Sequence, residues 1–435
     1  MADLNETHDP KRKSWIESAN APGCDFPIQN LPFGVFRPPV GEPRGGVAIG
    51  DQILDVAAMA DFLTGLSARA AADCKAPHLN RMIELGPHAW SALRRDLSRL
   101  LSTQSADWRH RVEPHLTPVA SAELLLPLHV PNYTDFFASI FHATNAGRMF
   151  RPDNPLMPNY KYVPVAYHSR ASSVRVSGTP VVRPKGQIKP GDAPAPVYSA
   201  CRALDFELEL GVVVGMRSEL GTAIPIASAG ESIFGFCLLN DWSARDIQAW
   251  EYQPLGPFLG KNFSTTISPW IVTAEALAPF RTKAYPRPEG DPAPLPYLTD
   301  AADQAQGGII IEMSAYILTP KMREQGVAPF RLAHSPFATL YWTVAQMIAH
   351  HTCNGCNLEV GDLIGSGTVS GPEKSGWGSL LELSARGREP IELPSGEKRG
   401  FIEDGDEIVF RGRCERQGCT PIGFGECRGV VLPAN

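Results

Sequence analysis

Short apolar stretches separated by turn residues make up most of the chain, and they predict strands more often than long helices. The run "IFGFCLL" (233–239) is apolar at every position, which is typical of a buried strand. The stretch "GGVAIGDQILDV" (45–56) places two apolar segments around Gly50-Asp51 and predicts a hairpin. A helical periodicity is clear in "WSALRRDLSRLL" (90–101), which predicts an amphipathic surface helix with Trp90, Leu93, Leu97, Leu100 and Leu101 on one side.

Two further segments with polar residues at regular spacing also predict helices. "NYTDFFASIFHATNAG" (132–147) indicates a helix capped by Thr134 and ended by Gly147. On such a helix Asp135 and His142 would share one face, with Cα atoms about 10 Å apart. Asn240-Asp241 opens a second helical pattern, whose stripe would either face water or line a polar cavity; it consists of Asp241, Arg245, Gln248 and Tyr252.

Composition favours a two-domain protein of mainly β or α+β class. The 435 residues exceed the usual size of one hydrophobic core, and 40 prolines and 39 glycines are spread along them. The first 120 or so residues contain the predicted hairpin and the predicted surface helix, whereas the segments with candidate catalytic and metal-binding residues begin after about residue 120. We therefore expect a small domain at 1–120 and a larger one at 121–435.

Charge and cysteine usage exclude several classes of partner. A net charge of −6 without a basic block argues against nucleic acid. The absence of an 18-residue apolar run argues against a membrane span, and the first residues lack the apolar core of a secretory signal. Nine scattered cysteines fit a reducing cytoplasm. The spacing of Cys353 and Cys356 would also suit zinc, but Asn354-Gly355 between them indicates a tight turn instead.

The segment "CRALDFELELGVVVGM" (201–216) puts Glu207 and Glu209 on one face of a strand, directly before an apolar run. Such a pair either faces water or binds a cation that neutralises it. Together with Asp135 and Asp241 the pair forms an all-oxygen ligand set, which suits Mg²⁺ or Ca²⁺ better than zinc. Further along, "GPFLGKNF" puts Lys261 on a turn, and a Gly/Ser-rich loop (361–383) is expected to enter a strand that holds Glu382.

These segments together resemble the fumarylacetoacetate hydrolase family. The resemblance covers nearly the whole chain, and its most specific part is "NDWSARDIQAWEYQPLGPFLGK" (240–261). It implies an SH3-like β-barrel N-terminal domain, a mixed β-roll catalytic domain and a homodimer. It also implies cleavage by water of a C–C bond in 4-fumarylacetoacetate, a 1,3-diketone acid, to fumarate and acetoacetate, the last step of tyrosine and phenylalanine catabolism.

The resemblance also assigns roles to individual residues. It implies that Asp135, Glu207, Glu209 and Asp241 bind the metal, that His142 is the general base and that Glu382 orients it. Arg245, Gln248 and Lys261 would stabilise developing negative charge. The remaining substrate contacts would be Arg151, Tyr167, Tyr252 and Thr368, together with Phe137, which replaces a tyrosine of the animal enzymes. A second cation site would involve Asp241 and the segment from Lys261 to Thr265.

Two alternative functions stay open at this point. A related acylpyruvate hydrolase, or an oxo-acid decarboxylase or isomerase on the same core, would use the cation; the decarboxylase or isomerase would not need a water-activating histidine. A calcium-stabilised binding module would leave His142, Lys261 and the stripe at 241–252 without a role.

Overall fold

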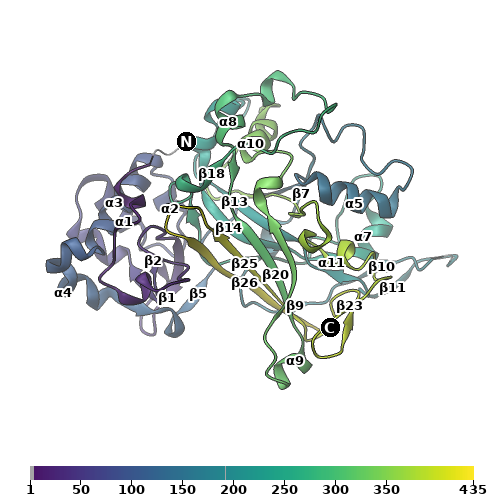
Figure 1. The fold of residues 1–435 in the computed structure, drawn as a ribbon, viewed down its shortest axis with the longest axis horizontal. Helices are drawn as coiled ribbons and strands as arrows, with labels where there is room; N and C mark the ends of the chain where they lie inside the picture. Colours follow the sequence, from purple (N-terminus) through teal and green to yellow (C-terminus); the bar gives the residue numbers. More distant parts are fainter. Residues whose placement is uncertain (1–3, 192) are drawn as a thin grey trace.

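The computed structural model describes residues 4–191 and 193–435. Its N-terminal unit consists of a five-stranded antiparallel sheet and short helices on the left of Figure 1. The sheet has the order β4-β3-β2-β1-β5, and the predicted hairpin is its β2–β3 pair, with Ile49 opposite Gln52. The strands are β1 (Phe33–Arg37), β2 (Arg44–Ile49), β3 (Gln52–Asp55), β4 (Leu116–Pro118) and β5 (Glu123–Leu125). The helices are α1 (Gly65–Asp73), α2 (Asn80–Ile83), α3 (Pro87–Leu100) and α4 (Arg109–Val112).

The predicted surface helix is α3, and its apolar side is buried as expected. The SH3-like form of this unit and the domain boundary after residue 120 stay predictions. Strand β5, which pairs with β1, lies after that boundary.

The larger unit is built on two sheets, whose long strands cross the middle of Figure 1. The larger sheet has the order β7-β6-β22-β13-β14-β16-β8, with β17 also paired to β14; the other has the order β21-β20-β25-β26-β9. The first contains β6 (Tyr133–Phe136), β7 (Ala166–His168), β8 (Val174–Val176), β13 (Leu208–Val214), β14 (Ile233–Asp241), β16 (Thr265–Ile267), β17 (Val272–Thr273) and β22 (Leu363–Gly365). The second contains β9 (Val181–Val182), β20 (Glu312–Leu318), β21 (Phe330–Pro336), β25 (Glu407–Cys414) and β26 (Ile422–Leu432).

Shorter elements complete this unit. Two-stranded pairs are formed by β10 (Lys185–Ile188) with β11 (Val197–Ala200), β12 (Leu204–Asp205) with β15 (Ser243–Ala244), β18 (Arg281–Thr282) with β19 (Gly308–Ile309), and β23 (Ile391–Glu392) with β24 (Lys398–Arg399). The helices are α5 (Ile140–Phe150), α6 (Ile226–Ala229), α7 (Arg245–Glu251), α8 (Ala301–Gln306), α9 (Pro320–Glu324), α10 (Val344–Thr352) and α11 (Leu380–Leu383). Within the described ranges, no helix is both long enough and apolar enough to cross a membrane.

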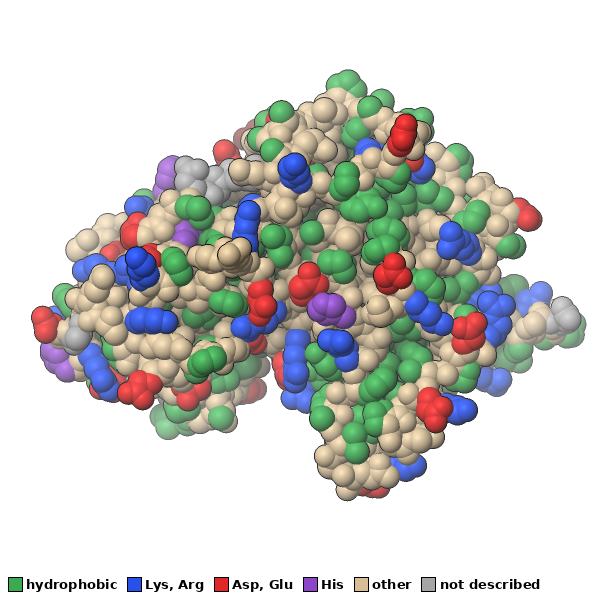
Figure 2. Space-filling model, viewed as in Figure 1, with side chains coloured by type: hydrophobic (Ala, Val, Ile, Leu, Met, Phe, Trp, Pro, Cys, Tyr) green, Lys and Arg blue, Asp and Glu red, His purple; other side chains and the backbone are tan. Residues whose placement is uncertain are grey.

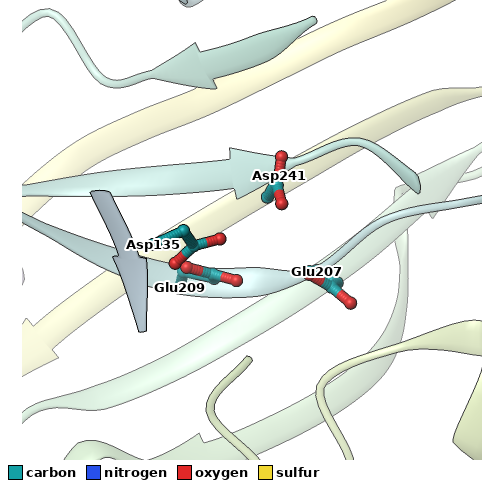
Figure 3. A group of neighbouring side chains, drawn as sticks. All are labelled: Asp135, Glu207, Glu209 and Asp241. Atoms are coloured by element: carbon teal, nitrogen blue, oxygen red, sulfur yellow. The ribbon is translucent and has the colours of Figure 1, made fainter. Parts of the chain in front are cut away.

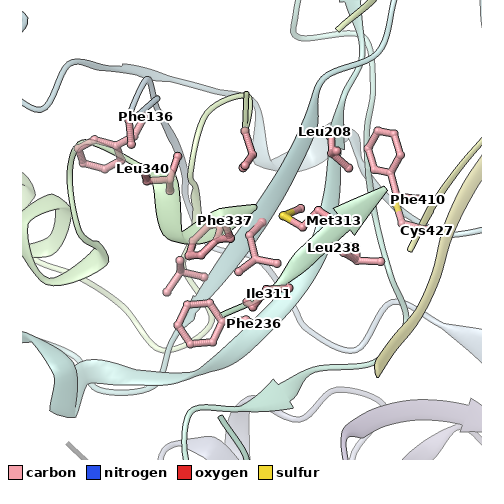
Figure 4. Close-up of a cluster of buried hydrophobic side chains, with 14 of the residues drawn as sticks. Phe136, Leu208, Phe236, Leu238, Ile311, Met313, Phe337, Leu340, Phe410 and Cys427 are labelled. Carbon is pink, nitrogen blue, oxygen red and sulfur yellow. The ribbon is translucent and has the colours of Figure 1, made fainter. Parts of the chain in front are cut away.

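Strands β13 and β14 are buried on both faces, which explains their continuous apolar sequences. Phe236 and Leu238 enter the core shared with the second sheet, shown in Figure 4, whereas Cys237 and Leu239 enter a core shared with the N-terminal unit. Truncating such a buried leucine to alanine typically costs about 2–5 kcal/mol. The two cores therefore hold the central strands rigidly, and the ends of these strands carry the acidic residues described below.

The surface is of mixed charge. On the face in Figure 2, acidic and basic side chains are interspersed over both units. This distribution agrees with the modest net charge of the chain.

Candidate active site

Four buried carboxylates meet at the ends of the central strands (Figure 3). Each of Asp135, Glu207, Glu209 and Asp241 offers an oxygen atom within 4.8 Å of the others. Asp135 lies in β6, Glu207 directly before β13, Glu209 near the start of β13 and Asp241 at the end of β14. The sequence-based grouping of these four residues is therefore confirmed as a geometric cluster.

Two of the local predictions behind this grouping were wrong. The segment 132–147 is not one helix: Asp135 lies in strand β6, and helix α5 begins after the cap Ser139, whose Oγ accepts from the His142 N–H. Asp241 likewise ends strand β14 and does not open the helix that carries Arg245. In both cases pairing with neighbouring strands overrides the local helical pattern, because β6 is hydrogen-bonded to β22 and β14 to β16.

Glycines of the 361–383 loop make room for the cluster and supply hydrogen bonds to it. A Cβ atom on Gly365 would lie 2.3 Å from the Asp135 Oδ1 atom, so any other residue at this position of β22 would collide with the carboxylate. The N–H of Gly367, which has φ +73°, donates to Asp135 at 3.2 Å and to Glu209 at 3.0 Å. The glycines of this loop therefore let the backbone lie close to the carboxylates and donate hydrogen bonds to them.

Two buried cations contact part of the cluster. Lys261 Nζ lies 2.5 Å from Glu207 and 2.9 Å from Asp241, and Arg245 lies 2.8 Å from Glu207. Burial alone would raise the pKa of Glu207, but Lys261 and Arg245 outweigh it and lower that pKa. Burial, and then the neighbouring acids, raise the pKa of Asp135 and of Glu209 well above the ordinary carboxyl range.

The cluster is suited to a divalent cation. Lys261 and Arg245 offset part of the charge of four carboxylates, and the Oε1 atom of Glu209 is buried with no hydrogen-bond partner among the described residues. Buried charge of this kind is normally paired or bound to metal. An all-oxygen donor set fits a hard cation. Asp241 is further fixed by Tyr167, whose hydroxyl donates at 2.6 Å, and by Thr265 at 3.3 Å.

A histidine–glutamate pair adjoins the cluster. The Nδ1 atom of His142 lies 2.7 Å from Glu382, and its Nε2 atom lies 3.8 Å from Glu207. Glu382 also accepts from Asn145, Ser370 and Ser379. Burial alone would raise the pKa of Glu382, but His142, Asn145 and Ser379 lower it. A carboxylate can only accept, so in this contact Nδ1 is the donor, and Nε2 is the ring nitrogen nearer to the acidic cluster.

Sequence reasoning placed Glu382 on the wrong kind of element and overlooked its supports. Glu382 lies in the short helix α11, capped by Ser379, and not in a strand. Asp205 was missed: its carboxylate accepts from Arg245 and from the N–H groups of Leu380 and Leu381, so it joins Arg245 to α11. The sequence did contain a sign of Asp205, because it is a third acid, two residues before Glu207. Asn145 could also have been recognised, because it lies one helical turn after His142.

A cavity of about 470 Å³ opens beside these groups. The predicted polar contacts all lie on its wall, as does Phe137, whose ring is 5.2 Å from the His142 ring; they are Arg151, Tyr167, Arg245, Gln248, Tyr252, Lys261 and Thr368. Buried atoms of Arg151, Arg245 and Thr368 lack hydrogen-bond partners within the described part of the chain. The wall therefore presents donors that a bound molecule could use.

Comparison with known proteins places this arrangement in a family. The model of the fumarylacetoacetate (FAA) hydrolase C-terminal domain matches residues 133–432, and that of the fumarylacetoacetase N-terminal domain matches residues 29–127. The chain belongs to the fumarylacetoacetate hydrolase family.

Individual members of this family align with nearly the whole chain. It is 50% identical to the fumarylacetoacetase of Bos taurus, over 95% of this chain and 98% of that protein. It is 46% identical to the fumarylacetoacetase of Arabidopsis thaliana, over 97% of this chain and 99% of that protein. The solved structure of Cg1458 with inhibitor has a TM-score of 0.50 at 14% identity, over 93% of this chain and 100% of that chain, and supports the fold.

Proposed function

We propose that this chain hydrolyses 4-fumarylacetoacetate to fumarate and acetoacetate, the last step of tyrosine and phenylalanine catabolism. The observation that carries the proposal is the His142–Glu382 pair beside the acidic cluster, in a chain 50% identical to a fumarylacetoacetase. In this reaction water adds to the ketone carbonyl of the fumaryl group, and the bond from that carbon to the adjoining CH2 carbon breaks. The oxygen of water enters the new carboxylate of fumarate, and a proton completes the methyl group of acetoacetate.

His142 takes the proton from the attacking water at Nε2. Its Nδ1–H donates to Glu382, which fixes the ring and stabilises the imidazolium once the proton has moved. A decarboxylase or isomerase would not need to activate water, so the pair favours hydrolysis.

Donors on the cavity wall bind the charge that develops on oxygen. Arg245 contributes its unpartnered guanidinium nitrogen, Lys261 its remaining N–H, and Gln248, which accepts from Arg245 at 3.2 Å, its amide N–H groups. Such fixed donors stabilise an oxyanion most effectively in a buried site. Arg151, Tyr167, Tyr252, Thr368 and Phe137 would then hold the rest of the substrate.

Asp135, Glu207, Glu209 and Asp241 would hold Mg²⁺ or Ca²⁺, which supplies a Lewis acid and a template for the diketone oxygens. The proposal includes a homodimer in the cytoplasm and a second, weaker cation site near Asp241 and the segment from Lys261 to Thr265.

The test is a product assay with purified protein. Incubation with 4-fumarylacetoacetate and Mg²⁺ should consume the substrate absorbance and release fumarate and acetoacetate in equal amounts, and EDTA should stop the reaction. Release of carbon dioxide, or rearrangement without cleavage, would replace this proposal with the decarboxylase or isomerase alternative.

A further inference from the structure

Glu251, the last residue of helix α7, has no role in the chemistry proposed above, although it lies within the most specific stretch of the sequence. A negative charge at the C-terminal end of a helix is unfavourable, because the carbonyl groups there already carry partial negative charge. Helix α7 therefore gains nothing from an acid at this position. The contacts of the carboxylate lie instead beyond the helix.

The Glu251 carboxylate binds three successive backbone N–H groups. Its Oε1 atom accepts from Phe258 at 2.8 Å and from Gly260 at 2.7 Å, and its Oε2 atom accepts from Leu259 at 3.0 Å. Hydrogen bonds to an ionised acceptor are stronger than neutral ones. One side chain thus closes the loop 252–260 by joining its two ends.

The closed loop ends directly at Lys261. The backbone at Gly260 passes so near helix α7 that an added Cβ atom would lie 2.8 Å from the Cβ atom of Gln248, and its carbonyl accepts from the Ala244 N–H at 2.8 Å. Lys261 follows at once, with its ammonium buried between Glu207 and Asp241.

The middle of the loop is held by a backbone hydrogen bond from the Gly256 N–H to the Tyr252 carbonyl at 2.6 Å, and its side chains are largely exposed. Leu255 is 96% exposed and Phe258 is 65% exposed, although Tyr252, Leu255, Gly256 and Pro257 line the cavity. An apolar segment that is this exposed gains little from packing. Its position depends mainly on how its ends are fixed.

We propose that Glu251 is a positioning residue, which clamps the loop 252–260 and thereby holds Lys261 against the acidic cluster. The part of this inference that concerns turnover rests on the proposed function, whereas the clamp itself does not. Without the carboxylate, the three N–H groups would turn to water and the Lys261 ammonium would lose its fixed place.

Hydrogen exchange tests the clamp directly. In Glu251→Ala the amides of 258–260 should exchange at least about tenfold faster than in the wild type, while amides of the central strands stay unchanged. Glu251→Gln, which keeps one acceptor oxygen, should show a smaller increase in the exchange rate of these amides. It replaces the alanine variant in this test if that variant does not fold. Glu113→Gln, which alters an exposed ion pair with Arg109 on α4, is the matched control. Unchanged exchange at 258–260 would overturn the proposal.

Mn²⁺ affinity tests whether Glu251 acts through Lys261. Lys261→Met removes a positive charge from the cluster and should tighten Mn²⁺ binding about tenfold, and Glu251→Ala should tighten it partly. The double variant should bind Mn²⁺ as Lys261→Met does, because the two residues act as a unit. Additive effects, or an unchanged affinity in Glu251→Ala, would overturn the positioning role. In wild-type background, Glu251→Ala should also lower kcat about tenfold. A wild type without turnover would refute the proposed function and leave the exchange and Mn²⁺ results to decide the clamp.

Discussion

Replacing Glu382 by glutamine removes the negative charge beside His142 and keeps the shape of the side chain. The remaining oxygen can still accept from His142, Ser370 and Ser379, and the amide of Asn145 can turn to accept from the new NH₂ group. The expected loss is therefore mainly electrostatic. With charge centres about 4 Å apart and an effective dielectric constant near 20, the imidazolium loses about 4 kcal/mol of electrostatic stabilisation. A barrier raised by this amount lowers kcat about 10³-fold.

The assay is steady-state turnover of 4-fumarylacetoacetate at saturating Mg²⁺, with bound metal and Tm measured on the same samples. Glu382→Gln should keep its metal and fold and lose kcat by about 10²–10³-fold, whereas His142→Ala should lose more, since the base itself is gone. Glu389→Gln, at an exposed glutamate paired with Lys374, is the matched control and should retain full activity. A Glu382→Gln enzyme within threefold of the wild type would refute the electrostatic role of this carboxylate.

Three further predictions concern the cluster and the cavity. Glu207→Gln or Asp241→Asn should leave a folded protein with little bound divalent ion, measured by metal analysis; unchanged metal content in both would contradict the ligand set. Because the pKa values of Asp135 and Glu209 are raised in the metal-free fold, the stability that these groups contribute is lost as pH rises, while a bound ion keeps them charged. The fall in Tm caused by EDTA should therefore be larger at about pH 8 than at about pH 5, and the opposite trend would be inconsistent with these shifts. Phe137→Tyr should change KM less than about tenfold, and a large loss of folded protein would show that the ring belongs to the core.

The sequence alone predicts those helices and strands whose pattern of apolar residues matches their burial in the fold. The run 233–239 is apolar throughout because cores lie on both faces of β14, and α3 shows one buried side because that side enters the core shared with the N-terminal unit. The acidic cluster was also predictable, since carboxylates next to buried strands require neutralisation.

Local patterns failed where strand pairing decides the conformation. Asp135 and His142 have helical spacing, but hydrogen bonds between β6 and β22 draw Asp135 into the sheet, and the helix starts only after Ser139. One support of Glu382, Asn145, comes from a segment distant in the chain, and its helical spacing from His142 was the one sign of this contact. The clamp by Glu251 is closer in sequence, but its partners are backbone N–H groups, which carry no sequence signal.

Turnover in water enriched in ¹⁸O tests the central claim most directly. If His142 activates water for attack on the fumaryl ketone, one ¹⁸O atom should appear in each fumarate, and none should enter acetoacetate during the cleavage step. The His142→Ala variant should form no labelled fumarate but should still bind Mg²⁺. Unlabelled fumarate, label that enters acetoacetate during the cleavage, or labelled fumarate formed at the normal rate by His142→Ala would contradict the account.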